Sequence, residues 1–281
     1  MRKAFVFWLL ATAALALSMP AGACGDNGTT KWTQLPDLSA TGMNVNATFR
    51  GDSPFVKVLA DDFQCTSAGY ITAIQVWGSW LEDNVSLIAP IKLSIHADVP
   101  ANVDAPYSHP GAVLWQRTFS VGEYSAGSGG FASESFYDPN TDTIIGHDQQ
   151  VLQYDFSIPR AAAFLQQGTA GQPVVYWLDV QAQQAQPSSN TIFGWKTSLN
   201  HWNDDAAFAD TQTFGGLPTG PMAAPVYWKH MHYPAGHDLA GQSIDLAFAI
   251  TSEPVPEPGT CALLLALAAT ALAACAARRW R

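Results

Sequence analysis

The 281-residue chain contains little charge, and little of that charge is positive. Only 13% of its residues are charged, and 13 Lys and Arg stand against 23 Asp and Glu, which gives a formal net charge of −10. Phosphate backbones and anionic lipid surfaces attract clusters of basic side chains, which so acidic a chain does not supply. We therefore expect no nucleic-acid partner, whereas divalent cations remain compatible with the composition.

Cysteine is also scarce. Of the four cysteines, Cys261 and Cys275 lie in a hydrophobic run near the C-terminus, which leaves Cys24 and Cys65 for the rest of the chain. An oxidising compartment would permit a disulfide between these two. Alternatively, Cys65 is a small buried hydrophobic residue. The sequence leaves both readings open.

Familiar catalytic motifs are missing. The chain has no Gly-x-Ser-x-Gly nucleophile turn, no His-Glu-x-x-His and no EF-hand loop. Carboxylates occur in pairs at Asp61-Asp62 and Asp204-Asp205, but neighbours on a strand point to opposite faces, so neither pair forms a ready acid/base couple. We predict a protein that is not an enzyme; the alternative is a secreted hydrolase with an unrecognised site.

The N-terminus has the three parts of a secretory signal peptide. Arg2 and Lys3 are basic, residues 4–17 are apolar, and Ala21-Gly22-Ala23 offers small residues for cleavage. We expect residues 1–23 to be removed on export. Lipidation of Cys24 is disfavoured, because the usual Leu three residues earlier is absent.

The C-terminus, residues 254–281, combines a Pro256-Glu257-Pro258 motif, an apolar run over 260–277 and a basic end. Eighteen uncharged residues in a helix reach ~27 Å, close to the ~30 Å hydrocarbon core of a bilayer. The basic end favours the cytoplasmic side, which leaves the residues upstream of Pro254 outside. A transmembrane helix is therefore predicted over 260–277.

This tail resembles the PEP-CTERM sorting domain. The resemblance implies an exosortase-type membrane transpeptidase as partner, recognition of the Pro-Glu-Pro motif, transient membrane anchoring, and final delivery to the cell surface or extracellular matrix. The alternative is an ordinary single-span anchor that is never cut.

The intervening residues, 24–253, are expected to form one all-β domain. Apolar and polar residues alternate over Ile91–His96 and again over Ile244–Ile250, the pattern of half-buried strands. β-branched and aromatic residues predict further strands at 55–63, 70–77, 112–119, 151–158, 174–180, 191–196 and 226–233. Gly127–Gly130 and Gly215–Pro221 are interpreted as turns, Arg160–Gln167 as one short helix, and Tyr137–Gln149 as a long loop. The fold prediction is a jelly-roll-like antiparallel β-sandwich.

Several segments of this domain resemble short sequence motifs that recur in one family. They are Val58–Cys65, Ile71–Trp80, Leu93–Pro100, Tyr176–Ala182, Phe193–Ser198 and His201–Ala206. Together they resemble an uncharacterised extracellular domain found in PEP-CTERM and planctomycete proteins, over most of residues 31–251. The resemblance implies an extracellular β domain and names no activity.

Oxygen-bearing side chains gather at Asn203, Asp204 and Asp205. A loop of this kind could hold Ca²⁺ together with backbone carbonyls, giving a calcium-stabilised module without a glycan ligand. The plainer interpretation makes Asp204 and Asp205 turn and capping residues, Asp61 a solvated strand residue and Asp62 a hydrogen-bonded one.

His230 and His232 share one face of a predicted strand, and His237 follows closely. Such spacing could gather a transition metal. Two outward-facing histidines on a half-exposed strand explain the pattern equally well.

Tryptophan is abundant, with 10 residues in the chain. Most must fill the core, but exposed planar rings also stack on sugars in binding domains. Trp80, at a strand end beside Gly78 and Ser79, and Trp202, in a polar segment, are the candidates for exposed ligand-binding residues. Together with the tail, they predict an exported structural or carbohydrate-binding component of exopolysaccharide or biofilm.

Overall fold

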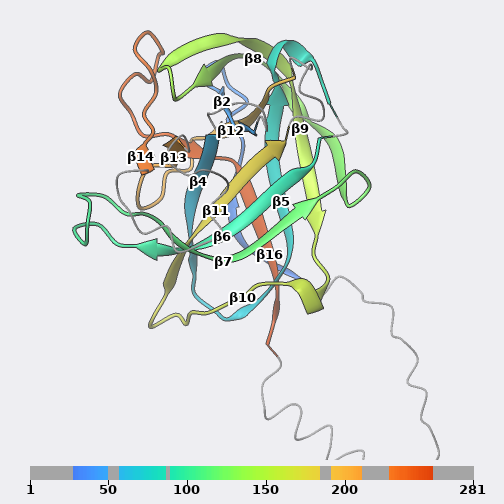
Figure 1. Ribbon diagram of the computed structural model, residues 1–281, viewed down its shortest axis with the longest axis vertical. Helices are drawn as coiled ribbons and strands as arrows, with labels where there is room; N and C mark the ends of the chain where they lie inside the picture. The colour runs from blue at the N-terminus through green and yellow to red at the C-terminus, as the bar shows by residue number, and fades with distance from the viewer. Residues whose placement is uncertain (1–27, 50–56, 87–88, 184–190, 211–227, 256–281) are drawn as a thin grey trace, which may run out of the picture.

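The computed structural model describes residues 28–49, 57–86, 89–183, 191–210 and 228–255 (Figure 1). Within these ranges the regular structure is almost entirely β-strand, and the helices are two single 3₁₀ turns, η1 (Leu81–Asp83) and η2 (Arg160–Ala162). No helix in the described ranges is both long and apolar enough to cross a membrane. The predicted transmembrane segment, 260–277, lies outside them.

The described strands form two sheets. The larger contains nine strands, in the order β1 (Thr29–Gln34), β16 (Phe248–Pro254), β5 (Gly69–Trp80), β9 (Thr143–Ser157), β8 (Tyr124–Asp138), β2 (Met43–Asn46), β12 (Phe193–Ser198) and β15 (Asp245–Leu246), with β10 (Leu165–Gln166) beside β5. The smaller contains seven, β14 (Trp228–His230), β13 (Ala207–Asp210), β4 (Lys57–Cys65), β11 (Val174–Gln183), β6 (Ile91–Val99) and β7 (His109–Phe119), with β3 (Thr48–Phe49) beside β11.

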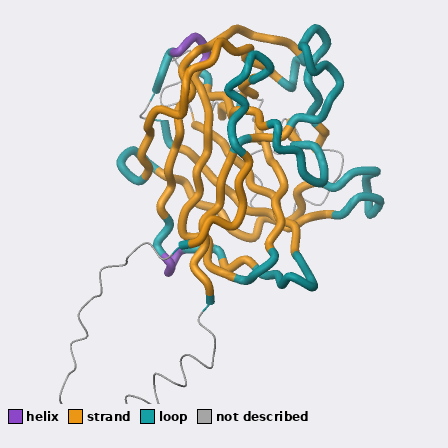
Figure 2. The backbone as a smooth tube through the Cα atoms, turned by 180° about the vertical axis from the view of Figure 1, so that it is seen from behind, coloured by secondary structure: helices purple, strands orange, loops and turns teal. Residues whose placement is uncertain are grey.

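Aromatic side chains from the two sheets meet between them. Phe63 of β4 packs edge-on against Phe248 of β16 at 6.1 Å, and Phe119 of β7 packs against Phe156 of β9 at 4.9 Å, both measured between ring centroids. One continuous cluster of buried apolar residues joins both layers. The predicted all-β sandwich is therefore confirmed, and Figure 2 shows its strands from behind.

Pairing within the described sheets is antiparallel except at β2–β8 and β3–β11, which are parallel. Ile91, Leu93 and Ile95 are buried in the core as predicted, but the expectation of half-buried strands is wrong: Ser94 and His96 on the other face are also buried, and so is every residue of 244–250. β1 runs antiparallel to β16, with Thr29 opposite Ser252, so the domain begins and ends at the same end of the sandwich (Figure 1). A jelly-roll connectivity stays a prediction.

The loop predicted over Tyr137–Gln149 is wrong. β8 continues to Asp138 and β9 begins at Thr143, so the two strands form a long hairpin with a short turn. Asp138 caps the turn by accepting a hydrogen bond from the Asn140 backbone N–H at 3.0 Å. The glycine cluster at 127–130, predicted as a turn, lies inside β8 instead, where an irregularity in register near Gly130 absorbs its positive φ of 137°.

The helix predicted over Arg160–Gln167 is also wrong. A single 3₁₀ turn ends at Ala162, and Leu165 and Gln166 then pair with Tyr70 and Gly69 of β5. Tertiary pairing with a sheet edge therefore overrides a local pattern that was too short to hold a helix by itself.

Candidate functional site

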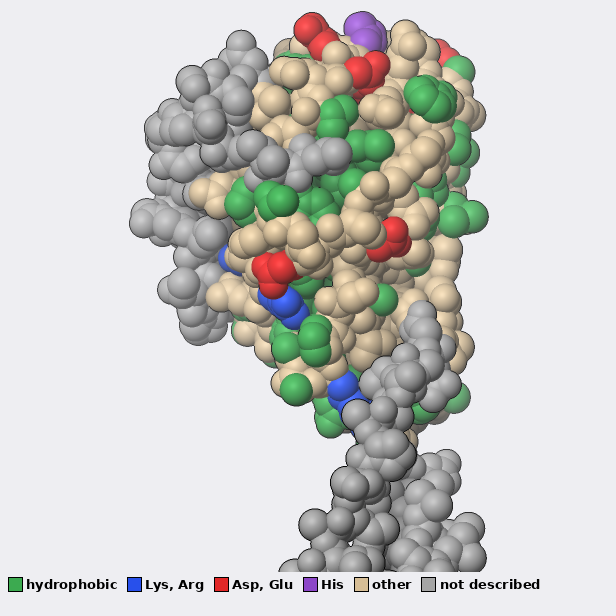
Figure 3. Space-filling view, turned by 90° about the vertical axis from the view of Figure 1, so that its right-hand side faces the viewer, with side chains coloured by type: hydrophobic (Ala, Val, Ile, Leu, Met, Phe, Trp, Pro, Cys, Tyr) green, Lys and Arg blue, Asp and Glu red, His purple; other side chains and the backbone are tan. Residues whose placement is uncertain are grey.

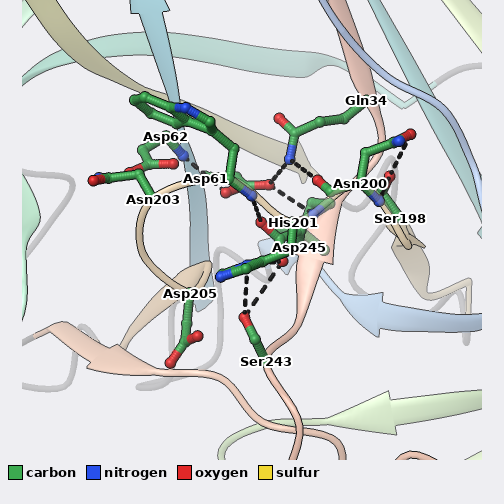
Figure 4. A network of polar contacts seen from close by, with 12 residues as sticks. Gln34, Asp61, Asp62, Ser198, Asn200, His201, Asn203, Asp205, Ser243 and Asp245 are labelled. Atoms are coloured by element: carbon green, nitrogen blue, oxygen red, sulfur yellow. Dashed lines mark hydrogen bonds and ion pairs between the residues drawn. The ribbon is translucent and has the colours of Figure 1, made fainter.

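The segment that follows β12 is fastened to buried carboxylates (Figure 4). Asn203 adopts a left-handed backbone conformation, with φ of 57°, and its side-chain Nδ2 donates to Asp62 Oδ2 at 2.5 Å. Asp204 has a different partner: its Oδ2 accepts hydrogen bonds from the backbone N–H and the hydroxyl of Ser108, at 3.2 and 2.5 Å. The segment is thereby held to β4 and to the chain preceding β7.

Asp61 lies at the centre of this network and is fully buried. Its Oδ2 accepts hydrogen bonds from the backbone N–H of Leu246 at 2.6 Å and from Gln34 Nε2 at 3.1 Å. The expectation of a solvated Asp61 is wrong, because Leu59, Asp61 and Phe63 alternate onto the same face of β4, and that face packs into the core. Asp62 is hydrogen-bonded, as predicted.

Asp245 supplies a third buried carboxylate from β15. It accepts a hydrogen bond from the backbone N–H of Trp202 at 3.4 Å and pairs with His201 Nδ1 at 2.8 Å. Two consecutive residues of the segment are therefore anchored to one side chain. His201 itself stays half-exposed at 53%.

Burial changes the titration of all three carboxyl groups. Desolvation, with repulsion from Asp245 and Asp62, raises the pKa of Asp61 well above its ordinary value. Burial likewise raises the pKa of Asp62 to about 8 and that of Asp245 to about 6. The protons that Asp61 and Asp62 keep near neutral pH allow these two carboxyl groups to lie buried beside Asp245.

The side chain presented by this fastened segment is Trp202. Its ring lies edge-on against Trp32 of β1, with 5.0 Å between centroids and 77° between planes. Both rings are partly exposed, and Trp32 Nε1 donates to Gln34 Oε1 at 2.6 Å. Trp202 is thus partly exposed, its predicted role in ligand binding stays a prediction, and Trp32, Gln34, Asp61 and Asp245 are the residues that position it.

Trp80 does not join this surface. It is only 2% exposed, donates from Nε1 to the hydroxyl of Tyr154 at 2.8 Å, and packs edge-on against Phe193. The prediction of an exposed Trp80 is wrong, because β5 extends to this residue and its side chain points into the core.

Residues 30–251, which contain both sheets and the fastened segment, match the model of a family described as a domain of unknown function, DUF7901. The chain belongs to the DUF7901 family. No curated protein and no solved structure matches the chain significantly.

In the DUF7901 domain, the three side chains considered for calcium have separate partners. Asn203 faces Asp62, Asp204 faces Ser108, and Asp205 faces two histidines. Across the described residues, no group of three or more His, Cys, Asp or Glu side chains is placed to hold a metal ion. The geometry thus gives these residues a role in fixing the segment.

His230 and His232 of the DUF7901 domain both contact Asp205 Oδ2, at 3.1 and 3.2 Å. His237 is placed apart from them and stacks on Tyr233 at 4.6 Å. Burial tends to raise the pKa of Asp205, but hydrogen bonds from His230 and Ser243 outweigh it and the pKa is lowered. The two histidines line an open cleft of about 580 Å³ together with Tyr137 and Phe208.

Two other predictions for the DUF7901 chain concern residues outside the described ranges. The sorting motif Pro256, Glu257 and Pro258 lies there, as does Cys24. Cys65 is described: it is a buried free thiol on β4 that donates to the carbonyl of Ser67 at 3.3 Å.

Proposed function

We propose that this protein is exported, sorted to the cell surface through its C-terminal tail, and binds extracellular polysaccharide through a surface formed by Trp32 and Trp202. The observation that carries the binding role is the partly exposed pair of aromatic rings, whose residues are held by hydrogen bonds to Gln34 and Asp245. Pyranose rings present planar apolar faces that stack on such side chains. A pair fixed before binding loses little conformational entropy on contact.

The surroundings of this aromatic surface support a neutral, polar ligand. The neighbouring Asn200 and His201 are exposed and offer hydrogen-bonding groups of the kind sugar hydroxyls use. Figure 3 shows one face of the domain, where the described acidic and basic side chains are scattered among uncharged ones. The formal net charge of −10 disfavours a polyanion, so a glycan rich in hydroxyl groups suits the protein better.

A binding role without catalysis is supported by where the carboxyl groups lie. Asp61 and Asp62 are both fully buried beneath the segment, and their hydrogen bonds are used to hold it. A glycosidase would need two carboxyl groups able to touch the scissile bond. These two position Trp202 instead.

Export and sorting rest on the two ends of the sequence. A basic and apolar N-terminus is followed, at the other end, by Pro256-Glu257-Pro258, an apolar run and arginines. The proposed partner is an exosortase-type membrane transpeptidase, with the membrane as a temporary location. Fractionation of cells that express the full chain or a chain ending at residue 253 tests this. The full chain should be found at the cell surface, and the shortened chain should be released into the medium. Release of both forms into the medium would contradict sorting through the tail.

Binding is tested by sedimenting the purified protein with exopolysaccharide from the producing cells, in Ca²⁺ and in chelator. Saturable co-sedimentation in both buffers is expected. Loss of binding in chelator would indicate that the polysaccharide binds through a calcium site at Asp204 and Asp205 instead of through the two tryptophans. The absence of binding in either buffer would contradict the proposal and leave a displayed structural domain.

A further inference from the structure

A second buried polar cluster lies on the other face of the nine-stranded sheet. Met43 and Val45 of β2 and Trp195 of β12 point into the core, so the alternate residues Asn44 and Lys196 share the opposite face. Glu134 of β8 and Asp148 of β9 reach the same place. All four polar side chains are buried, with at most 3% of each residue exposed.

Lys196 and Asn44 are direct partners in the antiparallel pairing of β12 and β2. Side chains in such positions start about 5 Å apart at their Cβ atoms. One carboxylate bridges them: Glu134 Oε1 lies 2.7 Å from Lys196 Nζ, and Glu134 Oε2 lies 2.7 Å from Asn44 Nδ2. Asp148 accepts a second contact from the same amide nitrogen, at 3.0 and 3.2 Å.

We infer that Lys196 and Asn44 form an intramolecular isopeptide bond, with Glu134 as the group that moves protons between them. The arrangement contains an amine, a carboxamide and an acid in one dry pocket, which are the components of an amide exchange. No oxidant, metal or cofactor is needed. The inference stands independently of any polysaccharide ligand.

The reaction balances as follows. Lys196 Nζ gives a proton to Glu134 and, as a neutral amine, attacks Asn44 Cγ to form a new C–N bond. The tetrahedral adduct collapses by breaking the bond from Cγ to Nδ2, while Glu134 returns a proton to the departing nitrogen. The products are a secondary amide between β12 and β2 and one molecule of ammonia. The ammonia takes up the one surplus proton of the original Lys196 ammonium group and leaves as an ammonium ion.

The electrostatics of the pocket favour the first proton transfer. Burial lowers the pKa of Lys196, and burial also raises the pKa of Glu134. Desolvation, with the neighbouring Glu134 charge, raises the pKa of Asp148 to about 7. A pocket in which the amine is readily neutral and the acids are readily protonated supplies both the nucleophile and the proton for the leaving group.

The leaving nitrogen is the part of Asn44 that the protein holds. Its Nδ2 contacts both acids, whereas Oδ1 is buried and has no hydrogen-bond partner among the described residues. The backbone at Gly42 packs directly against the amine, since a Cβ added there would lie 2.3 Å from Lys196 Nζ. Because the four polar residues are also buried, bulk water does not reach them, which protects an adduct from hydrolysis.

The product would join two strands that are far apart in the sequence. A covalent link between them closes a long loop and reduces the conformational freedom of the unfolded chain. Unlike a disulfide, an amide resists reduction. An exported protein with few cysteines gains from such a link a stability that does not depend on the redox state outside the cell.

Mass spectrometry of the wild-type protein tests the inference directly. Peptide mapping should recover one branched peptide that contains both Lys196 and Asn44, lighter than the sum of its two parts by one ammonia. Recovery of the two residues only in separate, unmodified peptides would overturn the proposal. This readout requires no variant to fold.

Three variants separate the chemistry from chance modification. Asn44→Asp should lose water instead of ammonia and yield a branched peptide of the same mass as wild type, since the product is the same amide. Lys196→Arg should give no branched peptide. Asn46→Asp, a buried neighbour on the same face of β2 opposite Gly194, is the matched control and should keep the full link.

Glu134→Ala tests the proton relay. Complete loss of the branched peptide, in a variant whose circular dichroism matches wild type, supports the assigned role. Unchanged cross-linking in a folded Glu134→Ala protein would overturn it. If this variant does not fold, Glu134→Gln, which keeps the size of the side chain but cannot accept a proton from Lys196, is mapped in the same way.

Discussion

The carboxylate of Asp61 accepts a hydrogen bond from the backbone N–H of Leu246, with 2.6 Å between oxygen and nitrogen. Asp61 belongs to β4 of the smaller sheet and Leu246 to β15 of the larger one. A buried carboxyl group therefore ties the two layers together directly beneath the segment that carries Trp202. The proposed ligand surface depends on this fastening.

Removing the Asp61 carboxyl should weaken the fold strongly. Asp61→Ala leaves the Leu246 N–H and the Gln34 amide buried without an acceptor, at a cost of about 3 kcal/mol in the free energy of unfolding. Asp61→Asn keeps one acceptor oxygen and should cost less. Urea denaturation measures both, with exposed Asp238→Ala as the control expected to change stability by no more than about 0.5 kcal/mol. Equal stabilities for all three would contradict the fastening role.

Stability should decrease as pH rises from about 4 to about 8. The folded pKa values of Asp245 and Asp62 are about 6 and about 8, above the ordinary value of 3.8, so the folded state binds more protons than the unfolded state in this window. The free energy of unfolding then falls with rising pH. Thermal melts across this range should show a lower Tm at pH 8 than at pH 5.

Asp62→Asn should flatten that pH profile between about 6 and 8, because it removes a group whose pKa is raised to about 8. An unchanged slope in this variant, or a wild-type Tm that rises with pH, would contradict the assigned protonation.

Much of the fold follows from local sequence patterns. β6 is predicted from the alternation of apolar and polar residues, and β11 and the later half of β9 from their β-branched and aromatic residues, and each strand contributes side chains to the core. β8 was missed because its glycines and serines carry no such pattern, and its place is set by pairing with β9. Tertiary contacts that the sequence does not display decide such segments.

The candidate site is only partly readable from sequence. The hydrogen-bonded Asp62 is predicted correctly and Trp202 is partly exposed, whereas Asp61 and Trp80 are misplaced. Alternation does contain the signal for Asp61, because Leu59 and Phe63 flank it on the core face. The charge of a carboxylate by itself favours a solvated position, and its partners Gln34 and Leu246 come from strands too distant in sequence to be predicted.

Trp80 should behave as a core residue. Trp80→Ala is expected to lower the free energy of unfolding by about 3–5 kcal/mol, because the cavity cannot close fully. Trp80→Phe keeps most of the packing with Phe193 but loses the hydrogen bond to Tyr154, and should cost less. Guanidinium denaturation gives both values. Polysaccharide binding by the folded Trp80→Phe protein should equal wild type, and its loss would place the ligand elsewhere.

Gly42 should not tolerate a side chain. A Cβ there would lie 2.3 Å from the Asp37 carbonyl oxygen and from Lys196 Nζ, so Gly42→Ala should destabilise the protein by about 1–3 kcal/mol. Gly127→Ala is the matched control, since nothing lies within 4 Å of its added Cβ. Equal denaturation midpoints for the two variants would contradict this prediction, because they would mean that the backbone around Gly42 can shift away from Lys196.

The central claim is that Trp202 and Trp32 bind polysaccharide, and titration calorimetry tests it most directly. The dissociation constant for the exopolysaccharide is measured for wild type, Trp202→Ala and Phe131→Ala, the last removing an aromatic ring that is 72% exposed on β8. Trp202→Ala should weaken binding about tenfold or more, the cost of removing a central aromatic contact, and Phe131→Ala should match wild type. Equal affinity of wild type and Trp202→Ala would contradict the account.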